Sequence, residues 1–323
     1  MALTYKKIKV RRFMRFLGLV FTVLFFVFAY WYLASRPPVI LQNIIKPPVD
    51  IAPKFLGNIL GGFHGTLAKP LDVVANSKGK IYVADSNNDR IQVFSPSGGP
   101  LFDFGSTGTG MGEFTYPNCL AVDGNDDIYV GEFKNNRIQV FTSAGKYLRS
   151  IKSPKNMLLE PLAMTFWNNN RLYVTNRNGV IIIMDRSGNV FTSIGASSNE
   201  KEHLSYPNGI AVDRNGNIIV SDSGNARLMV YNGLGKLTKI IAQPDLRAAV
   251  PRGITIDDKN RIYVVDIFGH KVVVYDSDFK FLFEFAKRGL DDGQLNFPNG
   301  IQYENNKIYV TDRENNRVVV FNY

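Results

Sequence analysis

IYVADSNNDRIQVF (residues 81–94) decides the fold of this 323-residue chain, because the stretch recurs along the sequence. Near-copies occupy residues 128–141, 218–231, 262–275 and 308–321, and a shortened copy occupies 172–185. A proline and an apolar run precede each copy, with successive spacings of 47, 44, 46, 44 and 47 residues between Pro70, Pro117, Pro161, Pro207, Pro251 and Pro298. A period of about 45 residues indicates one structural unit repeated six times.

Each repeat contains four short runs rich in β-branched and aromatic residues. In the second repeat the runs are CLAVD, DIYVGEF, RIQVFT and KYLRSI, separated by GNDD, KNN and SAG turns. Four antiparallel strands in each of six repeats predict an all-β, six-bladed β-propeller over residues 54–323. The last repeat stops after its third strand, and KFLGNIL (54–60) has the fourth-strand pattern, so we expect it to close the last blade.

The motif PNGIAVD followed by IYVxDxxNxRIxVF resembles the NHL repeat, and six such copies cover about residues 54–323. The third copy departs from the pattern, with Asn176 where the motif has Asp. The resemblance implies the propeller fold. It leaves the function open, because similar propellers include protein-binding modules, RNA-binding domains and a few lyases or lactonases.

The N-terminal segment predicts a membrane anchor. Residues 1–15 are basic and are expected in the cytoplasm, and FLGLVFTVLFFVFAYWYLAS (16–35) is a charge-free run whose helix would be about 30 Å long. This predicts a single-pass transmembrane signal anchor with the propeller on the extracytoplasmic side, periplasmic or at the cell surface. The alternative is a cleaved signal peptide, whose apolar region is shorter, about 7–15 residues. Residues 36–53, with two Pro-Pro pairs, predict an extended tether.

Charge and cysteine content exclude several classes of function. The chain has a net charge of +10, but residues 1–36 contribute seven basic residues and no acid, which leaves 31 basic and 28 acidic residues, or +3, for the remainder. The body therefore lacks the basic excess of a nucleic-acid-binding domain, and no nucleic-acid partner is expected. Because Cys119 is the only cysteine, an intrachain disulfide or a CxxC metal site is excluded.

A carboxylate and a cation five residues apart recur after the second run of most repeats. The pairs are Asp85 with Arg90, Glu132 with Arg137, Asp222 with Arg227, Asp266 with Lys271, and Asp312 with Arg317. An active site is asymmetric, so a pair repeated in five copies is predicted to fasten turns. Asp123, Asp213 and Asp257 are likewise expected to form turns. No catalytic residue is predicted, and the common hydrolase, Walker and dinucleotide motifs do not occur.

Residues that break the repeat are the candidates for binding. The innermost strands start at the prolines, so the following residues should surround one mouth of the central channel, on what we call the top face. This face also carries the turns between second and third strands and the loops that join blades. The candidate polar residues, for a small polar ligand or a peptide end, are Asp72, Asn118, Asn208, Arg252 and Asn299. The alternative is a water-filled channel without a ligand. Phe133, Phe268 and Phe114 are expected to be exposed apolar anchors, the first two at positions that are polar in other copies.

The three histidines, His64, His203 and His270, fall on predicted top-face loops but at non-equivalent positions of their repeats. The interpretation that we favour is three solvated loop histidines, and the alternative is a three-histidine zinc site. No cofactor is expected, and Cys119 is expected to be an inert buried thiol.

These observations favour a membrane-anchored, extracytoplasmic propeller that binds a protein or peptide of the cell envelope through its top face and acts as a scaffold. The alternative is a propeller enzyme, a lyase or lactone hydrolase with or without a metal, acting on a small ligand in the channel. A third possibility is an architectural ring within a larger envelope complex. The sequence leaves the oligomeric state open.

Overall fold

The computed structural model describes residues 52–153, 159–168, 170–195, 199 and 202–323. The predicted cytoplasmic segment (1–15), transmembrane anchor (16–35) and all but the last two residues of the tether (36–53) lie outside these residues. Among the residues described, no helix has the length and apolar character needed to span a bilayer.

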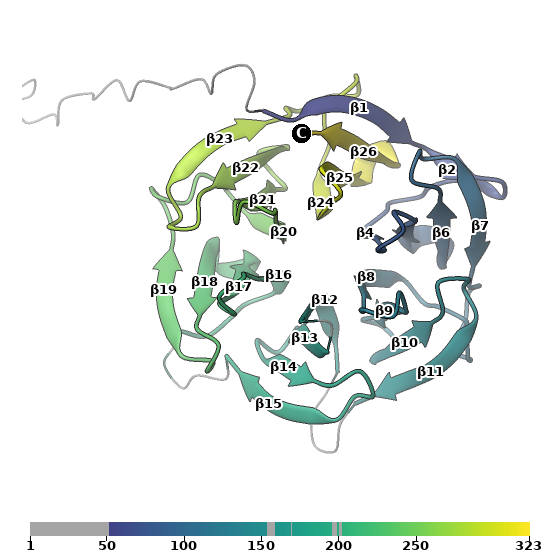
Figure 1. The fold of residues 1–323 in the computed structure, drawn as a ribbon, viewed down its shortest axis with the longest axis horizontal. Coiled ribbons are helices and arrows are strands. Elements are labelled where there is room, and N and C mark those ends of the chain that lie inside the picture. The colour runs from purple at the N-terminus through teal and green to yellow at the C-terminus, as the bar shows by residue number, and fades with distance from the viewer. Residues whose placement is uncertain (1–51, 154–158, 169, 196–198, 200–201) are drawn as a thin grey trace, which may run out of the picture. The chain divides into compact units, whose positions relative to one another are not determined.

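Six four-stranded antiparallel sheets form a ring, which confirms the predicted all-β six-bladed propeller (Figure 1). Blade 1 consists of β4 (Val73–Ala75), β5 (Ile81–Asp85), β6 (Arg90–Phe94) and β7 (Pro100–Phe104), and blade 2 of β8 (Pro117–Val122), β9 (Ile128–Glu132), β10 (Arg137–Phe141) and β11 (Tyr147–Lys152). Blade 3 consists of β12 (Pro161–Trp167), β13 (Arg171–Asn176), β14 (Ile181–Met184) and β15 (Val190–Ile194), and blade 4 of β16 (Pro207–Val212), β17 (Ile218–Asp222), β18 (Arg227–Tyr231) and β19 (Leu237–Ile241).

Blade 5 consists of β20 (Pro251–Ile256), β21 (Ile262–Asp266), β22 (Lys271–Tyr275) and β23 (Phe281–Phe285), and blade 6 of β24 (Pro298–Glu304), β25 (Lys307–Asp312), β26 (Arg317–Asn322) and β1 (Lys54–Ile59). A small hairpin of β2 (Gly61–Gly62) and β3 (Gly65–Thr66) follows β1. The helical structure of the described residues is limited to three short 3-10 turns, η1 (Ser86–Asn88), η2 (Ser223–Asn225) and η3 (Arg313–Asn315).

The hydrophobic core is divided among the six blade interfaces. Each of six clusters of buried apolar residues joins two neighbouring blades: one contains Cys119 of β8 and Met164 of β12, and another contains Val73 of β4 and Val318 of β26. The central strands are apolar on both faces because a blade packs against a neighbour on each side. Strand β5, IYVAD, is accordingly buried along its whole length.

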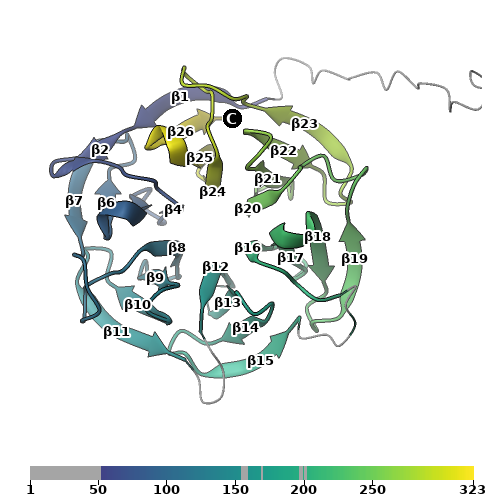
Figure 2. The ribbon, with the colours of Figure 1, turned by 180° about the vertical axis from the view of Figure 1, so that it is seen from behind.

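The ring closes through β1, the outermost strand of blade 6. It pairs antiparallel with β26, from Lys54 opposite Asn322 to Ile59 opposite Val318. Figures 1 and 2 show β1 on the outer rim beside β26, between β23 and the β2 hairpin. Because β1 runs antiparallel to β26, the chain enters the ring at the end of the channel opposite the top face, which we call the bottom face.

The repeated carboxylates fasten the interblade loops, as a structural role predicts. Asp85 accepts the Arg90 Nε hydrogen bond at 2.8 Å and the backbone N–H of Ala68 at 2.6 Å. The backbone partner lies in the loop that leads into the blade rather than in the turn itself. Asp222 and Asp312 hold Arg227 and Arg317 in the same way.

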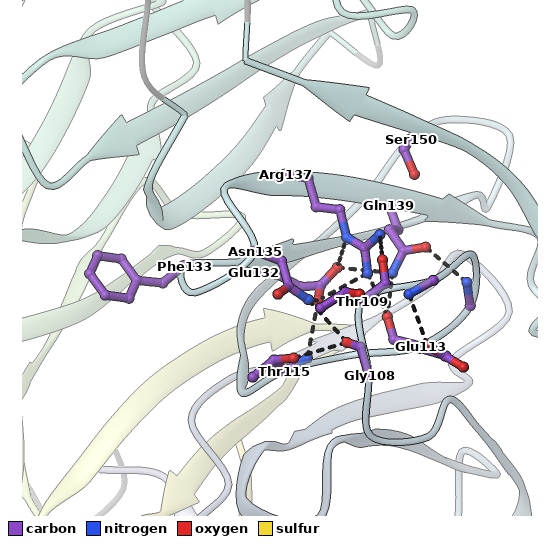
Figure 3. A network of polar contacts seen from close by, with 12 residues as sticks. Gly108, Thr109, Glu113, Thr115, Glu132, Phe133, Asn135, Arg137, Gln139 and Ser150 are labelled. Carbon is purple, nitrogen blue, oxygen red and sulfur yellow. Dashed lines mark hydrogen bonds and ion pairs between the residues drawn. The ribbon is translucent and has the colours of Figure 1, made fainter.

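Figure 3 shows this arrangement in blade 2. Glu132 pairs with Arg137 at 2.6 Å and accepts the backbone N–H of Thr115 at 3.1 Å. Arg137 also donates to the carbonyl oxygens of Thr109 and Glu113, so one ion pair holds the glycine-rich interblade loop. We call the buried carboxylate, its cation and the loop that they hold the clamp.

Blade 5 departs from the predicted pairing. Lys271 binds Glu284 at 2.7 Å, and Asp266 instead accepts backbone N–H groups of Ala249, Val250 and Gly269. Lysine lacks the planar fork by which arginine bridges a carboxylate and a loop carbonyl, so it is drawn to another acid. Asp123, Asp213 and Asp257 form the predicted bottom-face turns, each accepting backbone N–H bonds two and four residues ahead.

The clamp predicts a large stability cost for Asp85→Ala. The change leaves Arg90, whose side chain is 12% exposed, without its buried partner and removes the acceptor of the Ala68 N–H. We expect the free energy of unfolding to fall by about 3 kcal/mol, measured by urea denaturation. The control, Asp278→Ala on an exposed turn, should change it by less than about 0.5 kcal/mol. A loss below about 1 kcal/mol for Asp85→Ala would show that the clamp is dispensable.

Candidate functional site

The central channel contains a cavity of 680 Å³ lined by the innermost strands of all six blades. Four of the five predicted polar candidates line it: Asp72, Asn118, Asn208 and Asn299. The charged residues that line the cavity are all acidic: Asp72, Asp123, Asp126, Asp258 and Glu304. The channel wall is therefore unfavourable to anions, although the whole propeller is nearly neutral.

β-Bulges aim the residues that follow the prolines. In β8 the pairing with β9 jumps from Pro117 to Cys119, and in β20 the pairing with β21 jumps from Pro251 to Ile254. The skipped residues include Asn118 and Arg252, and β12, β16 and β24 have the same irregularity. A bulge turns a side chain away from the regular alternation, which brings these residues to the top mouth of the channel.

Asp72 takes a place that is glycine in three other blades. Its two carboxyl oxygens accept the backbone N–H groups of Val73, at 2.9 Å, and of Leu120 in blade 2, at 2.8 Å. Burial of the carboxyl raises the pKa of Asp72 to about 7, against the smaller opposing effect of the two hydrogen bonds. Asp72 therefore links blades 1 and 2 and changes its charge near neutral pH.

The three asparagines use their amides mainly to join segments of the ring. Asn118 donates to the Pro161 carbonyl of blade 3 at 2.8 Å and accepts the Phe133 N–H at 2.9 Å. Asn299 donates to the Leu71 carbonyl of blade 1 at 2.8 Å, and Asn208 donates to the Tyr206 carbonyl at 2.7 Å. Their predicted contact with a ligand stays a prediction, since much of their bonding capacity is already used.

Arg252 is the candidate whose polar group is left available. It forms no hydrogen bond or ion pair with the described residues, and its Nε is buried without an acceptor. Burial lowers the pKa of Arg252, the positive charge of Arg313 lowers it further, and Tyr116 raises it. Arg313 follows β25 in blade 6, and Tyr116 precedes β8 in blade 2. Arg252 therefore lies within electrostatic range of residues from these two blades.

Aromatic side chains surround the top mouth. Phe268 is 61% exposed and Tyr206 is 50% exposed, whereas Phe133 is partly buried. The Arg177 guanidinium lies 5.5 Å from the Phe133 ring centre and 5.9 Å from that of Tyr206. In Figure 3 the Phe133 ring points away from the clamp of its blade.

Two expectations about the phenylalanines were wrong. Phe114 is fully buried and packs against Phe104 and Phe141, because the glycine at Gly105 leaves room for its ring. The pairing of Asp266 with Lys271 also makes Ile267, not Phe268, the structural equivalent of Phe133. Phe268 lies one residue further along the turn, where it contacts Phe297 edge to face at 5.9 Å.

Tyr116, Tyr206 and Phe297 were missed as candidates. Each directly precedes the proline of an innermost strand and has a positive φ, of 57°, 47° and 50°. Residues before proline normally avoid helical conformations, so this left-handed backbone must be held by its surroundings. The signal in the sequence was the aromatic residue before Pro117, Pro207 and Pro298, but its conformation could not be read from it.

The histidines do not converge. His64 is exposed and bonds to Asp103 at 2.6 Å, and His203 is exposed. His270 is buried rather than solvated: its Nδ1 accepts the Phe297 N–H at 3.0 Å, and burial lowers its pKa. Asp89 and Asn316 occupy the same turn position and likewise accept the N–H of a residue before proline, from Tyr116 and Lys69. Within the described residues, no three His, Cys, Asp or Glu side chains form a group suited to a metal ion.

Cys119 is buried as expected, and burial, followed by the nearby charge of Asp72, raises the pKa of its thiol. A thiol whose pKa is raised is a poor nucleophile at neutral pH.

Comparisons with known proteins agree with the fold. A family profile described as a 6-bladed beta-propeller matches residues 65–159, and the NHL repeat profile matches residues 204–231 and 295–321. The chain thus contains NHL repeats in a six-bladed propeller. "Protein brain tumor" of Drosophila melanogaster is 32% identical over 140 residues, which are 42% of this chain and only 13% of that protein.

Solved propellers resemble the chain in structure. Virginiamycin B lyase from Staphylococcus aureus, solved with quinupristin, has a TM-score of 0.58 at 19% identity, over 79% of this chain and 81% of the lyase. A gluconolactonase from Xanthomonas campestris has a TM-score of 0.65 at 12% identity, over 86% of this chain and 94% of the lactonase. At these identities the likeness shows the fold alone.

The raised pKa of Asp72 predicts a pH-dependent stability. The folded chain holds a proton on Asp72 that the unfolded chain releases above its ordinary pKa of 3.8, so this stabilisation is complete below that pH and is lost as the pH rises through about 7. Relative to Asp72→Gly, the free energy of unfolding should fall by up to about 1.4 kcal/mol per pH unit in this window. Parallel pH profiles for the two proteins would contradict the assignment.

Proposed function

We propose that this protein is a membrane-anchored propeller that binds a protein or peptide partner of the cell envelope through its top face. The observation that carries the proposal is a set of aromatic side chains whose backbones are held by the scaffold. Asp89 accepts the N–H of Tyr116 at 2.6 Å, Asn118 that of Phe133 at 2.9 Å, and His270 that of Phe297 at 3.0 Å.

Held aromatic groups suit protein recognition. Aromatic residues and arginine contribute a large share of the binding energy at protein interfaces. Since the loops are already ordered, little conformational entropy would be lost on binding. Exposed Phe268 and Tyr206, with Arg177 between Phe133 and Tyr206, provide both kinds of group on one face.

The described chain begins at the face opposite the aromatic groups. The first described strand starts at the bottom face, where Lys54 pairs with Asn322. The charge-free run at 16–35 and the basic residues before it support a membrane anchor with the propeller on the extracytoplasmic side.

An enzyme acting within the channel is the second candidate. The 680 Å³ cavity and the structural likeness to a lyase and a lactonase support it. The channel groups argue against it, because both carboxyl oxygens of Asp72 and the amides of Asn118 and Asn299 already bond to backbone. The top face therefore has the stronger support.

The proposal predicts that the double variant Phe133→Asp, Phe268→Asp loses its partner. We expect recovery of the partner with the full chain from detergent-extracted membranes to fall about tenfold, because a charge at each position opposes burial of the apolar contact. Quantitative mass spectrometry of the co-purified proteins provides the measurement.

The matched control is Phe191→Asp, Leu234→Asp. These two residues are 58% and 94% exposed but lie on the outer rim and on the bottom face. The control should recover the partner at the level of the unmodified chain. Equal recovery with all three proteins would rule out the top face as the binding surface.

A further inference from the structure

Two arginines, Arg252 and Arg313, lie on the top face of neighbouring blades 5 and 6. Strand β20 packs against β24 closely enough that a Cβ atom at Gly253 would lie 2.7 Å from the Asn299 carbonyl oxygen. Because Pro298 pairs with Asp312, Arg313 lies beside the start of β24, and Arg252 lies at the start of β20 in the neighbouring blade. The effect of Arg313 on the pKa of Arg252 reflects this closeness.

These arginines are incompletely neutralised. Arg313 has one acidic neighbour, Glu314, at 3.4 Å, which also pairs with Lys69. Arg252 has no acidic partner among the described residues, and the Nε atoms of both arginines are buried without an acceptor. Buried N–H donors of a charged group are costly when unsatisfied, and like charges repel, so the pair is suited to an anion between the two guanidinium groups.

We infer that Arg252 and Arg313 bind a carboxylate of an acidic segment in the protein partner, an inference that rests on the proposed function. A carboxylate matches the two-pronged geometry of a guanidinium group and would offset the positive charge of the two arginines. Tyr116 from blade 2, on the opposite side of the ring, contributes to the same mouth.

The acidic channel wall explains why the anion belongs to a larger partner. An anion held at Arg252 is not drawn deeper, since the charged residues that line the cavity toward the bottom face, such as Asp123 and Asp258, are acidic. The segment is therefore held at the mouth, while aromatic neighbours such as Phe268 and Phe297 contact its apolar side chains. A protein segment fits better than a nucleic acid, because successive phosphates require a stripe of lysines and arginines, and here Glu314 and Glu160 stand beside the cations.

Thermal unfolding of the full chain tests whether Arg252 is unpaired in the absence of a ligand. In low-salt buffer without a ligand, Arg252→Gln should raise the melting temperature by about 2 °C, because it removes one of two repelling charges. Arg214→Gln, at an exposed bottom-face arginine, should leave it unchanged. A fall of several degrees for Arg252→Gln would mean that Arg252 has a structural role, and would overturn the inference.

Fluorescence anisotropy tests the ligand. The probe is a short labelled peptide in which glutamates alternate with phenylalanines, compared with the same peptide carrying glutamines. We expect the acidic peptide to bind at least about tenfold more tightly than the neutral one, and Arg252→Gln or Arg313→Gln to remove that difference, while Arg214→Gln preserves it. Equal binding of both peptides would overturn the inference, as would a labelled oligouridine that binds more tightly than the acidic peptide and depends on Arg252.

The outcomes separate this inference from the proposed function. If Phe133→Asp, Phe268→Asp loses the partner but Arg252→Gln retains it and still binds the acidic peptide more tightly than the neutral one, the top face is the binding surface and the carboxylate site is wrong. If the partner is retained by every variant, both fall.

Discussion

The top face depends on one interaction, the binding of an interblade loop by the buried carboxylate at the end of the second strand and its paired cation. In blade 1, Asp85 binds both the cation of its own hairpin and the backbone of the loop that arrives from the preceding blade. A propeller blade contacts only its neighbours, so a loop between blades is held only by the two blades that it joins. The ion pair adds a polar constraint to the buried apolar residue of the loop, such as Phe114: it holds the loop backbone by hydrogen bonds.

A hydrogen bond between neighbouring blades adds to the clamp. The residue in left-handed conformation at the end of the turn, Asp89, His270 or Asn316, accepts the N–H of the residue before the next proline. The chemistry of the acceptor differs among blades, but its place does not. The turn therefore fixes a side chain on the adjacent blade, so that Tyr116 and Phe297 are displayed by contacts made outside their own repeat.

The fold could be predicted because its determinants are local and periodic, whereas much of the site depends on contacts between blades. The spacing of the prolines and the strand pattern of RIQVF specify six blades, and KFLGNIL carries the fourth-strand pattern found in β1. Burial of Phe114 depends on Gly105 and on rings of two blades, which periodicity does not describe. The role of His270 was likewise hidden, because its partner, Phe297, lies 27 residues away across a blade boundary.

Blade 5 departs from the repeat at the top face, which bears on where specificity arises. In this blade Lys271 replaces the clamp arginine and binds Glu284. Its turn contains Ile267, Phe268 and His270 and lacks the 3-10 turn found in blades 1, 4 and 6. The same blade places Arg252 in the bulge where three other blades have an asparagine whose amide bonds to backbone, Asn118, Asn208 and Asn299. A ring of near-identical blades gives no direction to a ligand at its axis. Replacing a satisfied amide by an unpaired guanidinium in one blade breaks that symmetry, so a partner that carries a negative charge can bind in a single orientation.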